Sequence, residues 1–406
     1  MEAIRIRRLT HAMLHVECDF GQAAEIKEFF SFFVPGYQWM PAFKRRIWDG
    51  KIRLFDTNTG ELPAGLIHHL VQYIESRGYN YELVKTKYGT PLEDERPDPK
   101  EVVQFIKTLN LPFDPRDYQF IAIMEALHRT RGILLSPTGS GKSLIIYVLA
   151  KYWLSLVEGA LYGADKVLVI VPTTGLVEQM HGDFIQYGCN PDDLHRIYSG
   201  KDKQFKQNIY KLPKDWYQQF GMVVGDECHG FKSKSLMNIM NKATEAKYRY
   251  GTTGTLDGTQ THELVLQGLF GKTFKVTTTK KLQDSGTLAE LNIKRLVLDY
   301  SADARRDCEQ KSYQDEIEFI VTNEKRNRLI RNLALDQNGN TLVLFNFVEK
   351  HGKPLFDLIQ DKADEKRKVF FVSGSVATSD REAIRGIVEK QKNAIIVASL
   401  GTFSTG

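Results

Sequence analysis

Residues 132–143 read Gly132-Ile133-Leu134-Leu135-Ser136-Pro137-Thr138-Gly139-Ser140-Gly141-Lys142-Ser143, and this stretch decides the fold. Its first four residues predict a short buried strand, and the spacing of apolar residues over 144–156 predicts a helix after it. A glycine-rich loop between a strand and a helix is the context that a phosphate-binding P-loop requires. The strict pattern has glycine where Ser136 stands. A turn that carries Gly-Lys-Ser by chance is the alternative, which the flanking strand and helix disfavour.

The residues of this loop suit the phosphates of a nucleoside triphosphate. Small side chains let backbone N–H groups surround the phosphates, and the start of the helix adds a favourable partial charge. We expect the Lys142 ammonium at the β- and γ-phosphates and the Ser143 hydroxyl at Mg²⁺. The loop residues predicted to bind ATP are Pro137, Thr138, Gly139, Ser140, Gly141, Lys142 and Ser143.

A pair of carboxylates follows a second apolar run. Residues 221–224 predict a strand, and Gly225 leads from it into Asp226-Glu227-Cys228-His229. An acid at the end of a strand beside the P-loop strand can hold Mg²⁺, and the next carboxylate can orient and deprotonate the attacking water. We therefore predict Asp226 as a metal ligand, and Asp226, Glu227 and Lys142 as catalytic. Asp-Glu alone would be a solvated turn, and zinc binding by the Cys-His pair lacks partner ligands at zinc spacing.

Length and composition exclude several classes of protein. A chain of 406 residues predicts two or three domains, and its 42% hydrophobic and 26% charged residues exclude disorder and fibrous repeats. Four scattered cysteines without a CxxC pair argue against a disulfide framework and favour a reducing compartment. Because no apolar run approaches about 18 residues and no signal sequence is present, we expect a cytoplasmic protein without membrane contact. The net charge of +5 weakly indicates a polyanionic partner.

Hydrophobic patterns and the positions of prolines and acids divide the chain into four segments. Residues 1–90 combine alternating patterns at 3–7 and 52–55 with helical patterns at 24–33 and 66–77, and predict a small α/β domain. Three prolines and four acids in 90–99 disfavour regular structure, so residues 91–110 are assigned to a linker. Alternating apolar and helical stretches then predict two α/β domains, 111–285 and 286–406. Strands are predicted at 132–135, 167–171, 222–224, 341–345, 369–372 and 394–398.

A basic and aromatic cluster lies in the N-terminal domain. Residues 44–53 hold five cations and one acid, and aromatic residues are interleaved from Tyr37 to Phe55. Because cations neutralise phosphates and aromatic rings stack on exposed bases, the cluster predicts a contact with branched or single-stranded DNA. Against this, residues 1–100 carry 14 basic and 14 acidic side chains, and Trp48 and Phe55 also suit a core. The predicted DNA contacts are Lys44, Arg45, Arg46, Lys51 and Arg53.

Several motifs occur in the order found in superfamily 2 helicases. They are residues 116–119 (Arg-Asp-Tyr-Gln), 136–143, 169–179, 226–229 and 251–256, and the resemblance spans nearly all of 111–406. Residues 48–54, 212–216, 325–327 and 398–406 more closely resemble the UvsW-type recombination helicases of T-even-like bacteriophages. The resemblance includes the N-terminal domain. It implies an α/β fold with two tandem RecA-like P-loop domains preceded by a small α/β N-terminal domain.

The resemblance implies roles for residues outside the P-loop. Arg116 and Gln119 stand where such helicases contact adenine and its phosphates; a surface helix start after Pro115 is the alternative. Thr173 and Thr174 match a motif that touches the nucleic-acid backbone, and Thr-Thr is also an ordinary helix N-cap. Residues 252–255 resemble the motif that links the nucleotide state to the grip on DNA, although a Gly/Thr turn would look the same. The residues implied in that coupling are His229, Thr253 and Thr255.

The implied function is ATP hydrolysis coupled to movement along DNA. The resemblance predicts an ATP-dependent DNA helicase or translocase that uses ATP and Mg²⁺ to unwind or branch-migrate recombination, replication-fork and R-loop intermediates. Implied partners are single-stranded and branched DNA, RNA–DNA hybrids, and single-strand-binding or recombination proteins, for a monomer in the bacterial host cytoplasm. Two alternatives stay open: a nucleotide-switched clamp that binds branched DNA without translocating, and an RNA helicase of the same superfamily.

Two departures from the family pattern lead to further expectations. The sequence ends at Gly406 inside a helicase motif, before the motif that supplies an arginine from the second domain, so we expect weak ATP turnover. Loss of such an arginine costs about 10³ to 10⁵ in rate in other NTPases. The stretch 198–209 is short for this fold, because a strand and a Thr-Trp DNA contact expected before Gln207 are missing.

Overall fold

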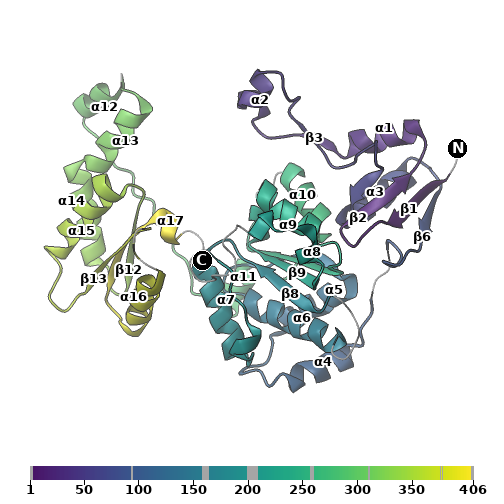
Figure 1. The fold of residues 1–406 in the computed structure, drawn as a ribbon. Coiled ribbons are helices and arrows are strands. Elements are labelled where there is room, and N and C mark those ends of the chain that lie inside the picture. Colours follow the sequence, from purple (N-terminus) through teal and green to yellow (C-terminus); the bar gives the residue numbers. More distant parts are fainter. Residues whose placement is uncertain are drawn as a thin grey trace. The chain divides into compact units, whose positions relative to one another are not determined.

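The P-loop lies in a five-stranded parallel sheet with the strand order β11-β7-β10-β9-β8 (Figure 1). The strands predicted at 132–135, 167–171 and 222–224 are confirmed. All seven residues of the strand before the acidic pair are buried, as a parallel strand covered on both faces requires. The strands of this sheet are β7 (Arg131–Leu135), β8 (Lys166–Ile170), β9 (Phe220–Asp226), β10 (Tyr248–Thr253) and β11 (Thr273–Lys275).

The computed structural model describes residues 3–92, 95–157, 164–198, 209–256, 260–309, 311–374, 376 and 378–403. They belong to two units, residues 1–290 and 291–406, which are described separately. The expectations for the short stretch before Gln207 and for the end of the chain at Gly406 concern residues outside these ranges. No helix in the described ranges is long and apolar enough to cross a membrane.

One prediction about the P-loop sheet is wrong. The sequence predicts the strand that ends in Asp226 beside the P-loop strand, but β10 pairs with both and lies between them. Thr252 is opposite Leu134 on one side and opposite Asp226 on the other. All six residues of β10 are buried, and a buried backbone needs a hydrogen-bonded neighbour on each side. Residues 252–253 therefore lie between the P-loop and the acidic pair.

Helices cover both faces of this sheet (Figure 1). Four helices share one buried core with the first face, and three helices share another with the opposite face. The first group is α4 (Pro99–Thr108), α5 (Asp117–Arg129), α6 (Lys142–Val157) and α7 (Thr174–Gln186). The second is α8 (Lys214–Tyr217), α9 (Lys234–Lys242) and α10 (Gln260–Phe270). The short helix α11 (Thr279–Asp284) follows β11.

Helix α4 lies in the segment that the sequence assigns to a linker. Asp98 caps it by accepting a hydrogen bond from the Lys100 backbone N–H at 2.8 Å, and Pro99 occupies its first turn, where a missing N–H costs nothing. Val102 and Ile106 are buried in the core beside α6. Two of the prolines of 90–99 thus precede a helix, and Pro99 begins it.

The N-terminal domain has a separate four-stranded sheet with the order β5-β2-β1-β6. Residues of β1 alternate between buried and exposed, which is the pattern of a sheet with one face on a core. A two-stranded arm, β3 paired with β4, extends the domain (Figure 1). Its elements are β1 (Ile4–Arg8), β2 (Met13–Glu17), α1 (Phe20–Phe29), β3 (Ser31–Phe33), α2 (Pro41–Lys44), β4 (Lys51–Arg53), β5 (Glu61–Pro63), α3 (Ile67–Ser76) and β6 (Tyr81–Val84).

Two details of the N-terminal domain differ from the sequence prediction. The helix predicted at 24–33 ends at Phe29, because residues 31–33 pair with β4 and cross-strand hydrogen bonds replace helical ones. Phe55 is in the core as expected, but Trp48 is only partly buried. Its indole N–H donates to the Lys51 carbonyl oxygen at 2.9 Å and stabilises the arm.

The N-terminal domain docks closely on α10 of the P-loop domain. A Cβ on Gly65 would lie 1.9 Å from the Gln267 carbonyl oxygen and 2.8 Å from that of Gly268, so only glycine fits. The His69 imidazole lies 2.6 Å from the Gln267 side-chain oxygen, and the Arg131 guanidinium donates to the His11 carbonyl oxygen. Both domains therefore belong to the same unit, residues 1–290.

The second unit has a parallel three-stranded sheet with the order β12-β14-β13. The strands predicted at 341–345, 369–372 and 394–398 are confirmed, the last with a shift of one residue. Leu355 and Ile359 of α15 pack on this sheet. The elements are α12 (Ala302–Glu309), α13 (Tyr313–Thr322), α14 (Glu324–Asp336), β12 (Thr341–Phe345), α15 (Lys353–Gln360), β13 (Val369–Val372), α16 (Thr378–Lys390), β14 (Ile395–Ser399) and α17 (Leu400–Phe403).

Replacing Gly65 with alanine is expected to destabilise the protein, because the new Cβ would overlap the backbone of α10. Overpacking of this kind lowers the free energy of unfolding by about 1–3 kcal/mol. Gly182→Ala is the matched control: this glycine lies inside α7 with no atom within 4 Å of an added Cβ, so alanine should stabilise by roughly 0.5–1 kcal/mol. Urea unfolding of both variants measures the two effects. Equal midpoints for Gly65→Ala and the parent would contradict the close docking.

Candidate nucleotide-binding site

The P-loop joins β7 to α6, and its glycines adopt backbone angles that other residues avoid. Gly139 and Gly141 have φ values of +79° and +78°. The buried Ser140 hydroxyl donates to the Pro137 carbonyl oxygen and lies 2.5 Å from the Ser136 hydroxyl. The serine at the first loop position therefore keeps its hydrogen bond inside the loop, which explains why this departure from glycine is compatible with the P-loop fold.

The start of α5 is bound to the P-loop through Gln119. Its amide N–H donates to the Ser140 carbonyl oxygen at 2.9 Å, and its amide oxygen accepts from the Arg116 backbone N–H at 2.8 Å. The Tyr118 hydroxyl donates to the same Ser140 carbonyl oxygen and accepts from the Arg116 guanidinium. Gln119 keeps one N–H and one lone pair beyond these bonds. Its contact with adenine, like that of the exposed Arg116, stays a prediction.

The predicted catalytic residues lie together. The Lys142 ammonium is 2.7 Å from a Glu227 carboxylate oxygen, and both side chains are mostly buried. Glu227 has a φ of +47°, an uncommon angle for a residue with a side chain, at the point where β9 ends. The turn directs its carboxylate to the P-loop lysine across the intervening β10. The ion pair leaves each charge compensated inside the site.

Asp226 is the buried acid of the site. It is 5% exposed, and its carboxylate accepts a hydrogen bond from the Thr252 hydroxyl at 2.5 Å. Burial raises the pKa of Asp226, an effect that the Thr252 hydrogen bond and the Lys142 charge oppose. A cation bound next to Asp226 would stabilise the ionised form of its carboxyl group, which burial disfavours.

The donor set suits Mg²⁺. The Ser143 hydroxyl and the Asp226 carboxylate supply hard oxygen donors, and Mg²⁺ usually takes one or two such protein ligands and completes its shell with phosphate and water. Within the described ranges there is no group of three or more His, Cys, Asp or Glu that could form a metal cage. The Cys228 thiol is fully buried, and burial raises its pKa, which is typical of a structural cysteine.

The structure brings the predicted coupling residues to the carboxylate of Glu227. The His229 Nδ1 atom lies 2.9 Å from the Thr253 hydroxyl and 3.3 Å from a Glu227 oxygen. The Thr253 hydroxyl donates to the Thr255 carbonyl oxygen at 2.9 Å. Thr253 is also hydrogen-bonded to the P-loop: its backbone carbonyl oxygen accepts a hydrogen bond from the Ser136 backbone N–H at 2.8 Å. Side-chain and backbone hydrogen bonds therefore join the P-loop, Glu227 and β10 in one network.

Thr173 and Thr174 lie at the start of α7, after the end of β8. The Thr173 hydroxyl accepts from the Leu176 backbone N–H at 3.3 Å, so it is the N-cap of the helix, and Thr174 is exposed. The N-cap role and a contact with a DNA phosphate are compatible. These threonines are separate from the network around Glu227.

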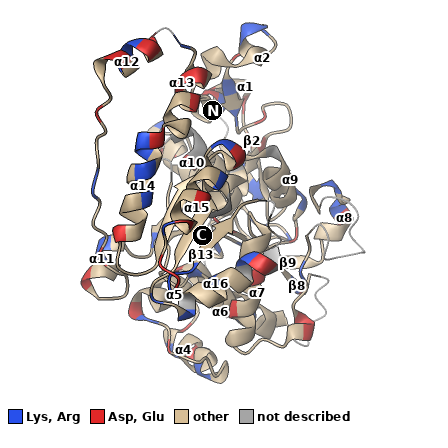
Figure 2. Ribbon diagram, turned by 90° about the vertical axis from the view of Figure 1, so that its left-hand side faces the viewer, with Lys and Arg blue, Asp and Glu red and all other residues tan. Residues whose placement is uncertain are grey.

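The five basic residues of the N-terminal arm fall into two groups. Lys51 pairs with Glu28 at 2.8 Å, and Arg53 pairs with Asp49. Lys44, Arg45 and Arg46 are exposed, and none of the three forms an ion pair with a described residue. Figure 2 shows basic residues in blue at α2. The Lys44 ammonium lies 5.5 Å from the centre of the Trp39 ring, which is 78% exposed.

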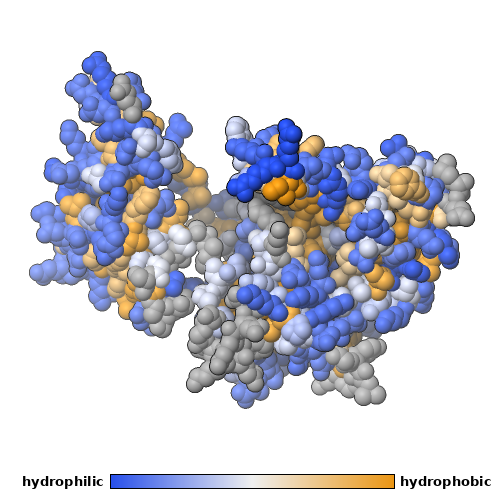
Figure 3. Space-filling model, turned by 45° about the horizontal axis from the view of Figure 1, so that its top comes forward, coloured by the Kyte–Doolittle hydropathy of each residue, from blue (hydrophilic) through white to orange (hydrophobic). Residues whose placement is uncertain are grey.

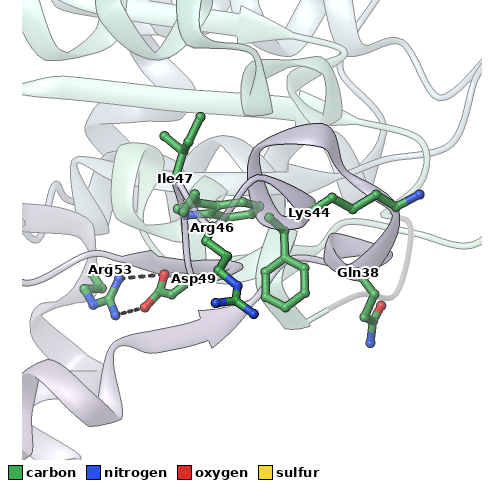
Figure 4. A pocket seen from close by; sticks show the side chains of 8 residues that line it. Gln38, Lys44, Arg46, Ile47, Asp49 and Arg53 are labelled. Carbon is green, nitrogen blue, oxygen red and sulfur yellow. Dashed lines mark hydrogen bonds and ion pairs between the residues drawn. The ribbon is translucent and has the colours of Figure 1, made fainter.

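A hollow of about 800 Å³ opens on this arm (Figure 4). The Arg53–Asp49 pair lies on one side of it and Lys44 extends from the other. On the face drawn in Figure 3, hydrophilic residues predominate and apolar residues form separate patches. The hollow is lined by Gln38, Phe43, Lys44, Arg46, Ile47, Trp48, Asp49 and Arg53.

Sequence reasoning missed three residues of the site. Tyr118 and Tyr187 bind the P-loop through their hydroxyls, and Thr252 holds the buried acid. Tyr118 and Thr252 both lie inside quoted motifs, which is a usable signal. Tyr187, just beyond the end of α7, belongs to no recognisable sequence motif, because only the packing of the folded chain brings it to Ser143.

Two family models and two relatives match this chain. Residues 3–84 match the family model described as the N-terminal domain of DNA helicase UvsW, and residues 112–258 match that of the res subunit of type III restriction enzymes. The chain is 36% identical over 411 residues to the ATP-dependent DNA helicase uvsW of Enterobacteria phage T4, covering 97% of this chain and 80% of that protein. A shorter match, 27% identical over 147 residues, is to the DNA 3'-5' translocase XPB2 of Sulfurisphaera tokodaii and covers 34% and 30%.

Two crystal structures of T4 UvsW are also similar to this structure. Both have a TM-score of 0.59; one is 32% identical and covers 100% of this chain and 81% of that chain. The other is 31% identical and covers 68% of this chain and 100% of that chain.

The fold and the site define an ATP-hydrolysing superfamily 2 helicase, with the predicted α/β architecture of RecA-like P-loop domains after a small N-terminal domain. The match over nearly the whole chain is more specific. This chain belongs to the UvsW family of ATP-dependent DNA helicases.

Glu227→Gln is expected to keep nucleotide binding and to lower ATP turnover by roughly 10²- to 10⁴-fold, because an amide cannot take a proton from the attacking water. ATPase rates and the affinity for a fluorescent ATP analogue measure the two effects separately. Asp226→Asn is the comparison, since it should instead raise the Mg²⁺ concentration that turnover requires. Loss of nucleotide binding in Glu227→Gln would contradict the assignment of a catalytic base.

Proposed function

We propose that this helicase remodels branched DNA, unwinding or branch-migrating recombination, replication-fork and R-loop intermediates. The observation that carries this proposal is the N-terminal arm, where Lys44, Arg45 and Arg46 are exposed beside the exposed Trp39. The arm belongs to the same unit as the P-loop. A surface that offers both cations and an aromatic ring suits the phosphates and unpaired bases found at a DNA branch.

The hydrolysis site is proposed to work by exchange of the Lys142 partner. The ammonium now pairs with Glu227, and the triphosphate offers it a stronger, multiply charged partner. The Glu227 carboxylate, released from the lysine, would orient the attacking water and accept its proton. Asp226 and Ser143 would hold Mg²⁺, which neutralises charge on the phosphates when it is bound.

Coupling to DNA is proposed to pass through the network of His229, Thr253 and Thr255. The imidazole and the Thr253 hydroxyl both contact the Glu227 side chain, so a change at that carboxylate alters their hydrogen bonds. Thr173 and Thr174 are proposed to contact the DNA backbone from the start of α7, a usual place for sequence-independent phosphate contacts.

The proposed partners are those that the family resemblance implies. They are single-stranded and branched DNA, RNA–DNA hybrids, and single-strand-binding or recombination proteins, for an enzyme that acts as a monomer. The proposed site of action is the cytoplasm of the bacterial host, where phage DNA is replicated and recombined.

A forked-DNA assay tests the motor. The parent protein is expected to displace a labelled strand slowly with ATP, in line with its expected weak turnover, and Lys142→Ala is expected to reduce displacement and ATP turnover to background, because the phosphates lose their lysine. Binding to the same fork without nucleotide should be unchanged in the variant. Fork binding without ATP-dependent displacement by the parent protein would favour the clamp, and displacement by Lys142→Ala at the parent rate would contradict the hydrolysis site.

The salt dependence of fork binding tests the arm. Replacing Lys44, Arg45 and Arg46 with alanine should weaken binding and flatten the log–log salt slope by roughly 2 to 3, since each phosphate contact contributes about 0.9. The double variant Arg5→Ala with Glu82→Ala is the control: it removes an existing ion pair of the same domain that is not among the predicted DNA contacts and leaves the net charge unchanged, so the slope should not change. An unchanged slope in a folded triple variant would move branch recognition to the P-loop domain.

A further inference from the structure

Tyr187 connects the end of α7 to the P-loop. It follows Gln186, the last residue of the helix, and its backbone N–H donates to the Asp183 carbonyl oxygen at 2.9 Å. The side chain is 7% exposed and packs against the rings of Tyr147 and Phe113, with ring centres 5.4 and 5.8 Å away. Its hydroxyl lies 3.0 Å from the Ser143 hydroxyl. The ring contacts therefore hold the Tyr187 hydroxyl in place next to the Ser143 hydroxyl.

The hydrogen bond to Tyr187 determines how Ser143 presents its oxygen. A serine hydroxyl has one proton and two lone pairs, and it rotates freely unless a partner fixes it. When Ser143 donates its proton to the phenol oxygen, both lone pairs stay available and point away from Tyr187. A hydroxyl in that orientation suits a cation that needs an oxygen lone pair.

We propose that Tyr187 is a positioning residue for Ser143 and thereby links the metal-binding hydroxyl of the P-loop to helix α7. This inference rests on the proposed role of Ser143 as a Mg²⁺ ligand. Helix α7 begins next to Thr173 and Thr174, the proposed contacts with the DNA backbone. A displacement of the helix by DNA would therefore reach Ser143 through one hydrogen bond, on a route that does not use the network of His229 and Thr253.

Phe is the conservative replacement, because it keeps the ring contacts and removes only the hydroxyl. The readout is the ratio of the dissociation constants of a fluorescent ADP analogue without and with Mg²⁺, which reports the contribution of the metal and needs no turnover. Tyr187→Phe is expected to reduce this ratio roughly three- to tenfold, the loss that one neutral hydrogen bond produces. The dissociation constant in EDTA should be unchanged.

Tyr147→Phe is the matched control. This buried tyrosine packs on Tyr187, and no hydrogen bond from its hydroxyl to the P-loop is recorded within the described residues. It should leave the Mg²⁺ ratio at the parent value. An equal reduction in Tyr147→Phe would overturn the inference, since general loosening of the core would then explain both.

Ser143→Ala separates this inference from the role of Ser143 itself. It should reduce the Mg²⁺ ratio at least as much as Tyr187→Phe, and the double variant should show no further reduction, because both changes act through one hydroxyl. A normal ratio in Ser143→Ala would remove the proposed metal ligand. A reduced ratio in Ser143→Ala with a normal ratio in Tyr187→Phe would overturn the positioning role alone.

Single-stranded DNA tests the link to α7. In the parent protein, added oligonucleotide is expected to change the Mg²⁺ ratio, and in Tyr187→Phe this change should be lost while oligonucleotide affinity in EDTA is kept. The same DNA-induced change in both proteins would overturn the link.

Discussion

Parallel pairing of β7, β10 and β9 is the constraint on which the site depends. Because parallel strands end at the same edge of a sheet, the loops that follow them begin side by side. The register places Thr253 opposite Leu135 and Thr252 opposite Asp226. Lys142 and Glu227 therefore form an ion pair although 85 positions separate them in sequence. The positive φ of Glu227 completes this arrangement by turning its carboxylate towards the P-loop.

The contact of Gly65 with α10 has a second consequence for function. It holds the N-terminal domain against the P-loop domain within one unit, with backbone atoms too close for any side chain between them. DNA bound to the arm would therefore be held by the same unit that binds the phosphates. Close backbone contact is well suited to this role, because it leaves little freedom for one domain to shift on the other.

Much of the fold and part of the site could be predicted from sequence. The P-loop, the acidic pair and six strands of the two parallel sheets each have a local pattern, because a buried strand is a short apolar run and a phosphate loop needs glycines. Three features were not predicted from the sequence: the position of β10, the end of α1 and the helix at Pro99–Thr108. For β10 and α1, pairing with distant residues overrides the local preference. The helix at Pro99–Thr108 instead begins at a local signal, the Asp98 cap followed by Pro99, which the prolines and acids around it conceal.

The sequence by itself determined the class of the protein, since the order of its motifs and the residue types within them specify a nucleotide-hydrolysing helicase. Only the tertiary structure decided which of those residues act together. It paired Lys51 and Arg53 with carboxylates and left Lys44, Arg45 and Arg46 exposed, although all five look alike in sequence. It also brought Tyr187 to Ser143. The reason is physical: hydrogen bonds and ion pairs depend on distances of about 3 Å, and for residues far apart in sequence only the folded chain determines those distances.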